Sequence, residues 1–161
     1  MISGGRALDY LSVIARQNHQ ISVQLSAKPK ETARAVQRLA DENFHLKGRV
    51  MRMEEQAFSQ KARECEGVGD VLLFESDLEA DSVRRLAVAV METCQGRCAV
   101  FSGDDSEGYK YAIGEKDGNL REFVKEMNQA LQGRGGGKPF FVQGSVKASE
   151  SEIRTYFQEK E

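Results

Sequence analysis

The sequence predicts an α+β fold, in which an N-terminal antiparallel helical hairpin (a coiled coil) precedes a small domain of the order βαββαβα with a mixed sheet. Three observations lead to this prediction. Apolar residues are spaced alternately four and three apart up to about residue 66. Beyond that point, short apolar runs alternate with amphipathic segments. Gly67 and Gly69 separate the two patterns, so we expect domains at residues 1–66 and 67–161.

The hairpin is predicted from two apolar seams that meet at Lys28-Pro29. The first seam comprises Ala7, Leu11, Ile14, Asn18, Ile21 and Leu25, and the second comprises Thr32, Val36, Leu39, Asn43, Leu46, Val50, Met53 and Ala57. Asparagines within a seam commonly fix register and oligomeric state, which favours a homodimer. The second helix is the longer one, so its last turns (58–65) must pack on the following domain or on a second subunit.

The second domain is predicted from four apolar runs, at residues 71–74, 98–101, 109–113 and 140–146. Amphipathic helices follow the first and third runs, and a last helix begins at Ser149. Glu152 stands three residues after Ser149, which is the spacing of a capping box. We expect these helices to lie on one face of the sheet.

Composition narrows the possible functions. The formal net charge of −2 excludes a globally basic nucleic-acid-binding protein, so a polyanion would require a local positive patch. No apolar run is long enough to span a membrane, and no signal region is visible, so we expect a cytoplasmic protein. The three cysteines fit reduced thiols, and the two histidines lie far from them. We therefore expect neither a metal nor a cofactor.

The segment from Gly133 to Gly144 reads GRGGGKPFFVQG and is the main candidate site. So many glycines argue against a helix or an ordinary strand, and we expect a loop with positive φ angles or with backbone that closely approaches another group. Consecutive exposed amides beside Arg134 and Lys138 would form an anion cradle. The alternative is a flexible linker between a helix and a strand.

The charges around this segment favour the anion site. No acidic residue occurs between Met127 and Ser149, whereas Arg134, Lys138 and Lys147 are positive. A positive window in an otherwise acidic domain is what a bound polyanion requires.

The order of hairpin, small α/β domain and glycine-rich motif resembles the C-terminal part of alanyl-tRNA synthetases and of the related long AlaX editing proteins. The opening GGRALDYL looks like the motif that follows their editing domain, and GRGGGKP followed by QGS looks like their terminal glycine-rich motif. The second domain is similar to the DHH-associated domains. Phe140 and Phe141 depart from the family pattern, in which a more polar or acidic start is expected. Because the chain begins near the inter-domain junction of these proteins, we expect a fragment of a longer protein.

The resemblance implies a domain that contacts tRNA, of which alanine tRNA is the expected one, and that promotes dimerisation. The expected nucleic-acid-binding residues, which include Lys147 from the positive window, are Arg134, Gly135, Gly136, Gly137, Lys138, Gln143, Gly144 and Lys147. The zinc motifs of the editing proteins (HxxxH and CxxxH) and the metal motifs of DHH phosphoesterases are missing, so we expect no catalysis by this chain alone. Two alternatives stay open: a purely structural dimerisation module, and a nucleotide- or phosphoester-binding accessory domain of the phosphoesterase type.

Overall fold

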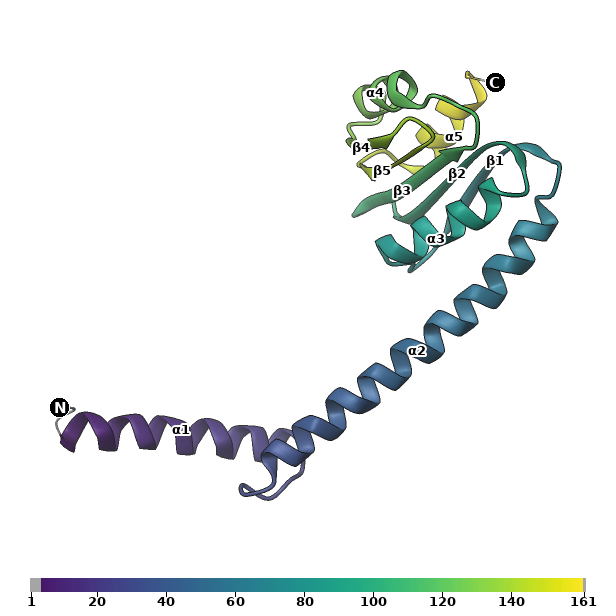
Figure 1. Ribbon diagram of the computed structural model, residues 1–161. Helices are drawn as coiled ribbons and strands as arrows, with labels where there is room; N and C mark the ends of the chain where they lie inside the picture. The colour runs from purple at the N-terminus through teal and green to yellow at the C-terminus, as the bar shows by residue number, and fades with distance from the viewer. Residues whose placement is uncertain (1–3, 161) are drawn as a thin grey trace. The chain divides into compact units, whose positions relative to one another are not determined.

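The computed structural model describes residues 4–160 and divides the chain into two compact units between Arg52 and Met53. Figure 1 shows two helices followed by a sheet with further helices around it. This order confirms the predicted α+β class. The boundary between the units falls inside the second helix. The predicted domain boundary at 66/67 falls instead between the second helix and the first strand, and it stays a prediction. Among the described residues, no helix is both long and apolar enough to cross a membrane.

The first unit contains α1 (Gly4–Gln24) and the beginning of α2 (Thr32–Glu64). Their connection is held by Asn18, whose side-chain amide donates to the Pro29 carbonyl at 2.7 Å. The Thr32 hydroxyl donates to the Asn18 side-chain oxygen, also at 2.7 Å. Asn18, predicted as a polar seam position, therefore ties the two helices together at their turn.

No residue of the two predicted apolar seams is buried. The buried residues near the turn, Ser22 and Ala35, each lie one position away from a seam residue, whereas Leu39 is 53% exposed and Val50 is 54% exposed. The seam positions farther from the turn thus face solvent within this unit. A long row of exposed apolar side chains on a helix is a common mark of an interaction surface.

The second unit is built on a five-stranded mixed sheet in the order β1-β2-β3-β5-β4. The strands are β1 (Gly69–Glu75), β2 (Gln95–Asp104), β3 (Gly108–Glu115), β4 (Arg134–Lys138) and β5 (Phe141–Val146). β1 and β2 are parallel, and the other neighbouring pairs are antiparallel. The helices are α3 (Ala80–Met91), α4 (Arg121–Ala130) and α5 (Glu150–Gln158). The order is therefore βαββαββα, with one strand more than predicted.

Helices cover both faces of the sheet, which corrects the prediction of a single covered face (Figure 1). Alternate residues of β2 enter opposite cores, because successive side chains of a strand point to opposite faces. Phe101 packs with residues of α4 and α5, whereas Val100 packs with residues of α3. Both side chains are fully buried. The first face lies under α4 and α5, and the second face lies under α3.

The last turns of α2 belong to this second unit. Phe58 and Ala62 are buried in the same core as α3. Farther up the helix, the Glu54 carboxylate accepts a hydrogen bond from Ser82 at 2.9 Å and pairs with Arg85. The domain itself, rather than a second subunit, thus supplies the surface that the sequence required for the end of the long helix.

The predicted capping box at the start of α5 is confirmed. The Ser149 hydroxyl accepts from the Glu152 backbone amide, and the Glu152 carboxylate accepts from the Ser149 amide at 2.8 Å. This arrangement satisfies amides that the first turn of a helix otherwise leaves unpaired.

Candidate nucleic-acid interface

The glycine-rich segment is a strand, not the predicted loop. Residues Arg134–Lys138 form β4, the edge strand of the sheet, and pair with β5 along its whole length. None of its three glycines has a positive φ angle. Pairing with β5 satisfies the backbone hydrogen-bonding groups on one side of the strand. Each glycine in a strand costs about 0.5–1 kcal/mol of conformational entropy, and this cost is offset where neighbouring backbone comes too close for a side chain.

Two of the predicted glycines are required by Tyr111. The register places Tyr111, Gly144 and Gly135 in one row across β3, β5 and β4. A Cβ on Gly144 would lie 2.8 Å from the Tyr111 ring, and one on Gly135 would lie 2.5 Å from the Tyr111 hydroxyl. Each would also lie within 2.7 Å of the other glycine's Cα atom. A tyrosine ring therefore lies across the two glycines, whose role is to make room for it.

Asn128 of α4 completes this arrangement. The Tyr111 hydroxyl donates to the Asn128 side-chain oxygen at 3.0 Å, and the Asn128 amide donates to the Gly135 carbonyl at 3.4 Å. Burial raises the pKa of Tyr111, so its hydroxyl keeps the proton that it donates. The edge strand is thereby held against α4. Gly137 is also a packing residue, because a Cβ there would lie 3.1 Å from the Cα of Val142.

Gly136 differs from its neighbours. A Cβ at this position would meet no atom within 4 Å, and its φ angle is not positive. Neither packing nor backbone conformation therefore requires glycine here. Because side-chain directions alternate along a strand, Arg134 and Lys138 share a face with Gly136, and so does Gln143, its partner on β5. We call this surface, defined by Arg134, Gly136, Lys138 and Gln143, the β4 face.

The β4 face is open and positively charged. It lies on the same side of the sheet as α3. That helix packs over β2 and β3 and not over β4. Arg134, Lys138 and Gln143 are exposed. Neither cation forms an ion pair with another residue between positions 4 and 160, although the Lys138 Nζ atom lies 5.8 Å from the centre of the Phe140 ring. Gln143 also lines a groove of about 430 Å³ beside α3.

Lys147 is less closely associated with the β4 face. It follows β5 at the end where Ser145 pairs with Arg134, and it is exposed. The structure thus brings the eight predicted residues together at one corner of the sheet. It separates them into packing glycines (Gly135, Gly137 and Gly144) and solvent-facing positions.

Four side chains of α4 that the sequence reasoning missed also lie beside β4. They line a groove of about 470 Å³ between α4 and β4 and are Arg121, Lys125, Asn128 and Gln129. The signal was available, since these residues form the polar stripe of a helix that directly precedes the glycine-rich motif, at spacings of three and four.

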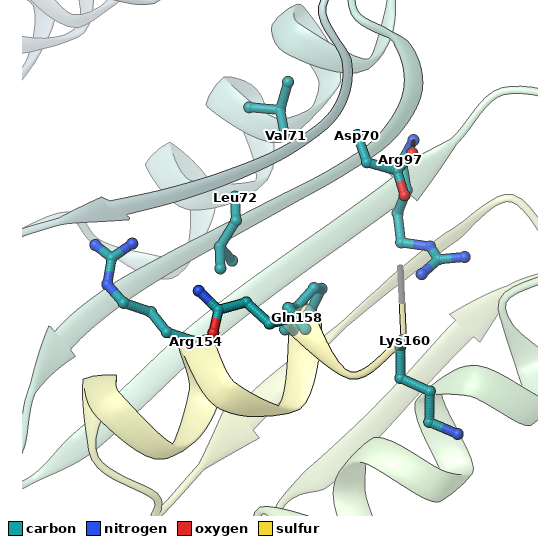
Figure 2. A pocket seen from close by; sticks show the side chains of 8 residues that line it. Asp70, Val71, Leu72, Arg97, Arg154, Gln158 and Lys160 are labelled. Carbon is teal, nitrogen blue, oxygen red and sulfur yellow. Dashed lines mark hydrogen bonds between the residues drawn. The ribbon is translucent and has the colours of Figure 1, made fainter.

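A second cationic pocket lies at the other end of the sheet, beside α5 (Figure 2). It has a volume of about 150 Å³, with Arg154 at one end, Lys160 at the other and Gln158 between them. Each of its cations already has a carboxylate partner: Arg97 with Glu115 at 3.5 Å, Arg154 with Glu150 at 2.6 Å, and Lys160 with Glu126 at 2.9 Å. Because these charges are already paired, this pocket is a weaker candidate for an anion than the β4 face.

Comparisons with known proteins identify relatives of this chain. The chain is 23% identical to an alanine–tRNA ligase of Psychrobacter sp. (strain PRwf-1) over 170 residues, which is 92% of this chain and 18% of that protein. It is 28% identical to the alanine–tRNA ligase of Frankia alni over 173 residues, which is 92% of this chain and 19% of that protein. The chain therefore spans less than a fifth of the length of these relatives.

One solved structure and one family model complete the comparison. A crystal structure of the C-Ala domain from Aquifex aeolicus alanyl-tRNA synthetase aligns with 58% of this chain and 94% of that chain, at 23% identity and a TM-score of 0.48. The model of the DHHA1 domain family matches residues 67–159. That match includes all of the sheet and its three covering helices. The chain belongs to the DHHA1 domain family.

Proposed function

We propose that this chain is a non-catalytic, tRNA-binding module, the C-terminal part of an alanyl-tRNA synthetase-related protein, and that it acts in the cytoplasm. The observation that carries the proposal is the β4 face, where two exposed cations, neither paired with an acidic group among residues 4–160, flank a glycine that the packing of these residues does not require. The relatives named above are alanine–tRNA ligases, which makes alanine tRNA the expected ligand.

The chemistry of the β4 face suits a phosphate backbone. Arg134 and Lys138 stand on either side of Gly136, about 13 Å apart along the strand, so the two charges can contact two phosphates of one nucleic-acid strand. The missing side chain of Gly136 lets a ligand approach the main chain closely. Contacts of this kind position a nucleic acid without reading its bases. Base preference would therefore come from other parts of a longer protein.

The proposal is tested by removing both charges in an Arg134→Gln, Lys138→Gln variant and titrating it with an alanine tRNA transcript in a filter-binding assay. We expect affinity to fall at least about tenfold in 50 mM salt. The slope of log Kobs against log[salt] should become shallower by about 1.4–1.8, because each lost phosphate contact contributes about 0.7–0.9.

An Arg154→Gln, Lys160→Gln variant is the matched control, since it removes the same charge from cations that are already paired beside α5. It should retain tRNA affinity close to that of the unchanged chain. If both variants lose tRNA affinity equally, affinity depends on net charge rather than on the β4 face. If neither variant loses affinity, the chain is better explained as a purely structural module.

We also propose that the chain forms a homodimer through the exposed seam of its first unit. Leu39 and Leu46 lie seven residues apart on α2, and both are exposed. Apolar residues repeating at this spacing are typical of helices that pair with another helix. A Leu39→Asn, Leu46→Asn variant should sediment as a monomer at concentrations where the unchanged chain sediments as a dimer. A monomeric unchanged chain at about 100 μM would contradict the proposal.

A further inference from the structure

The groove between α4 and β4 lies on the side of the edge strand opposite the β4 face. Its volume of about 470 Å³ falls within the usual range for ligand sites, about 300–1,000 Å³. Val124 and Val142 contribute apolar surface to it, and the main chain from Gly135 to Gly137 forms one wall. Arg121 and Lys125 belong to the opposite wall, on α4. We call this feature the α4–β4 groove.

The α4–β4 groove is positively charged and has no carboxylate among its lining residues. Arg121 and Lys125 are both exposed, and neither pairs with an acidic side chain anywhere from residue 4 to residue 160. They stand four residues apart on α4, so they are separated by about 6 Å along the helix axis and can face one ligand. The nearby Glu126 does not neutralise them, because it pairs with Lys160 at 2.9 Å.

Four cations that form no ion pair within the described part of the chain therefore surround one edge strand: Arg134 and Lys138 on one side, and Arg121 and Lys125 on the other. Three consecutive glycines lie between the two pairs, so no side chain blocks the path around the open edge. We infer that a bound RNA strand continues from the β4 face around this edge into the α4–β4 groove, where Arg121 and Lys125 contact a second stretch of its phosphodiester backbone. This inference rests on the proposed function.

An extended acidic peptide, paired as an extra strand on β4, fits the structure less well. The Gly135 carbonyl, on the edge strand that such a peptide would pair with, already accepts a hydrogen bond from Asn128 at 3.4 Å. The side-chain amide of Gln129 and the second amide hydrogen of Asn128 can instead donate to phosphate or ribose oxygens.

The test is an Arg121→Gln, Lys125→Gln variant of the full chain, titrated with the same alanine tRNA transcript. We expect affinity to fall about fivefold or more in 50 mM salt and the salt slope to become shallower by about 1.4–1.8, for two lost contacts. Combining these changes with Arg134→Gln and Lys138→Gln should double the change in slope. Both substituted residues are exposed, so thermal unfolding should be nearly unchanged.

The outcomes separate this inference from the function on which it rests. If only the Arg134→Gln, Lys138→Gln variant loses affinity, the proposed function stands and the α4–β4 groove is not part of the RNA path. If neither variant loses affinity, both proposals fail. A backbone-amide NMR titration adds an independent readout: RNA should shift the signals of residues 121–129, and shifts produced equally by inorganic phosphate would indicate a site for small anions and overturn the inference.

Discussion

Replacing Gly144 by alanine is expected to destabilise the sheet domain by at least about 3 kcal/mol, the upper end of the usual cost of overpacking. The new methyl group would lie 2.7 Å from the Gly135 Cα atom and 2.8 Å from the Tyr111 ring. Backbone on one side and a buried ring on the other leave no flexible group that can yield. Differential scanning calorimetry of the full chain should show the transition of the sheet domain lowered by about 12 °C or more.

A Gly136→Ala variant is the matched control for this measurement. It adds the same methyl group to the same corner of the sheet, where no atom lies within 4 Å. We expect unchanged stability, or a gain of up to about 1 kcal/mol because alanine loses less conformational entropy on folding. Similar transition temperatures for the Gly144→Ala and Gly136→Ala variants would show that Tyr111 does not constrain the neighbouring strands.

Replacing Phe58 by alanine is the second change with a large expected effect. Phe58 is 7% exposed, packs in the core beneath α3, and has the Arg85 guanidinium 5.6 Å from its ring centre. Truncating a buried phenylalanine usually costs about 3–5 kcal/mol. Because Phe58 joins the last turns of α2 to the domain, hydrogen exchange at residues 55–64 should become much faster.

Phe44 on the same helix provides the comparison. It is 77% exposed, so a Phe44→Ala change should alter stability by less than about 0.5 kcal/mol. If the two phenylalanine variants were equally stable, or if exchange at residues 55–64 were unaffected, the end of α2 would not be docked on the domain as described.

Much of the fold was predictable because it follows from local patterns. The apolar runs located β1, β2, β3 and β5, and the spacing of Ser149 and Glu152 located the start of α5. The covering of both sheet faces was missed, although the continuous apolar run from Cys98 to Phe101 is typical of a strand buried on both sides. β4 could not be predicted from propensity, since its pairing depends on distant residues of β3 and α4 that make glycine the residue that fits.

The residues that lie together at the candidate site could be predicted, but the role of each residue could not. The motif predicted that residues 134–138 lie close to Gln143 and Gly144, and the structure pairs these two segments. So few residues separate them that the chain must fold back as a hairpin. The difference between Gly135 and Gly136 could not be predicted, because it depends on which face of the strand Tyr111 occupies. Arg121 and Lys125 belong to another element, and only the packing of α4 on the sheet brings them to β4.

The contrast between Gly144 and Gly136 has a consequence for how substitutions would accumulate here. In a population selected only for folded protein, position 144 should stay glycine while position 136 drifts freely, since an added methyl group there meets nothing. Adding selection for the ligand should remove that freedom. A deep mutational scan scored once for abundance and once for RNA capture would therefore show position 136 tolerant in the first score and intolerant in the second.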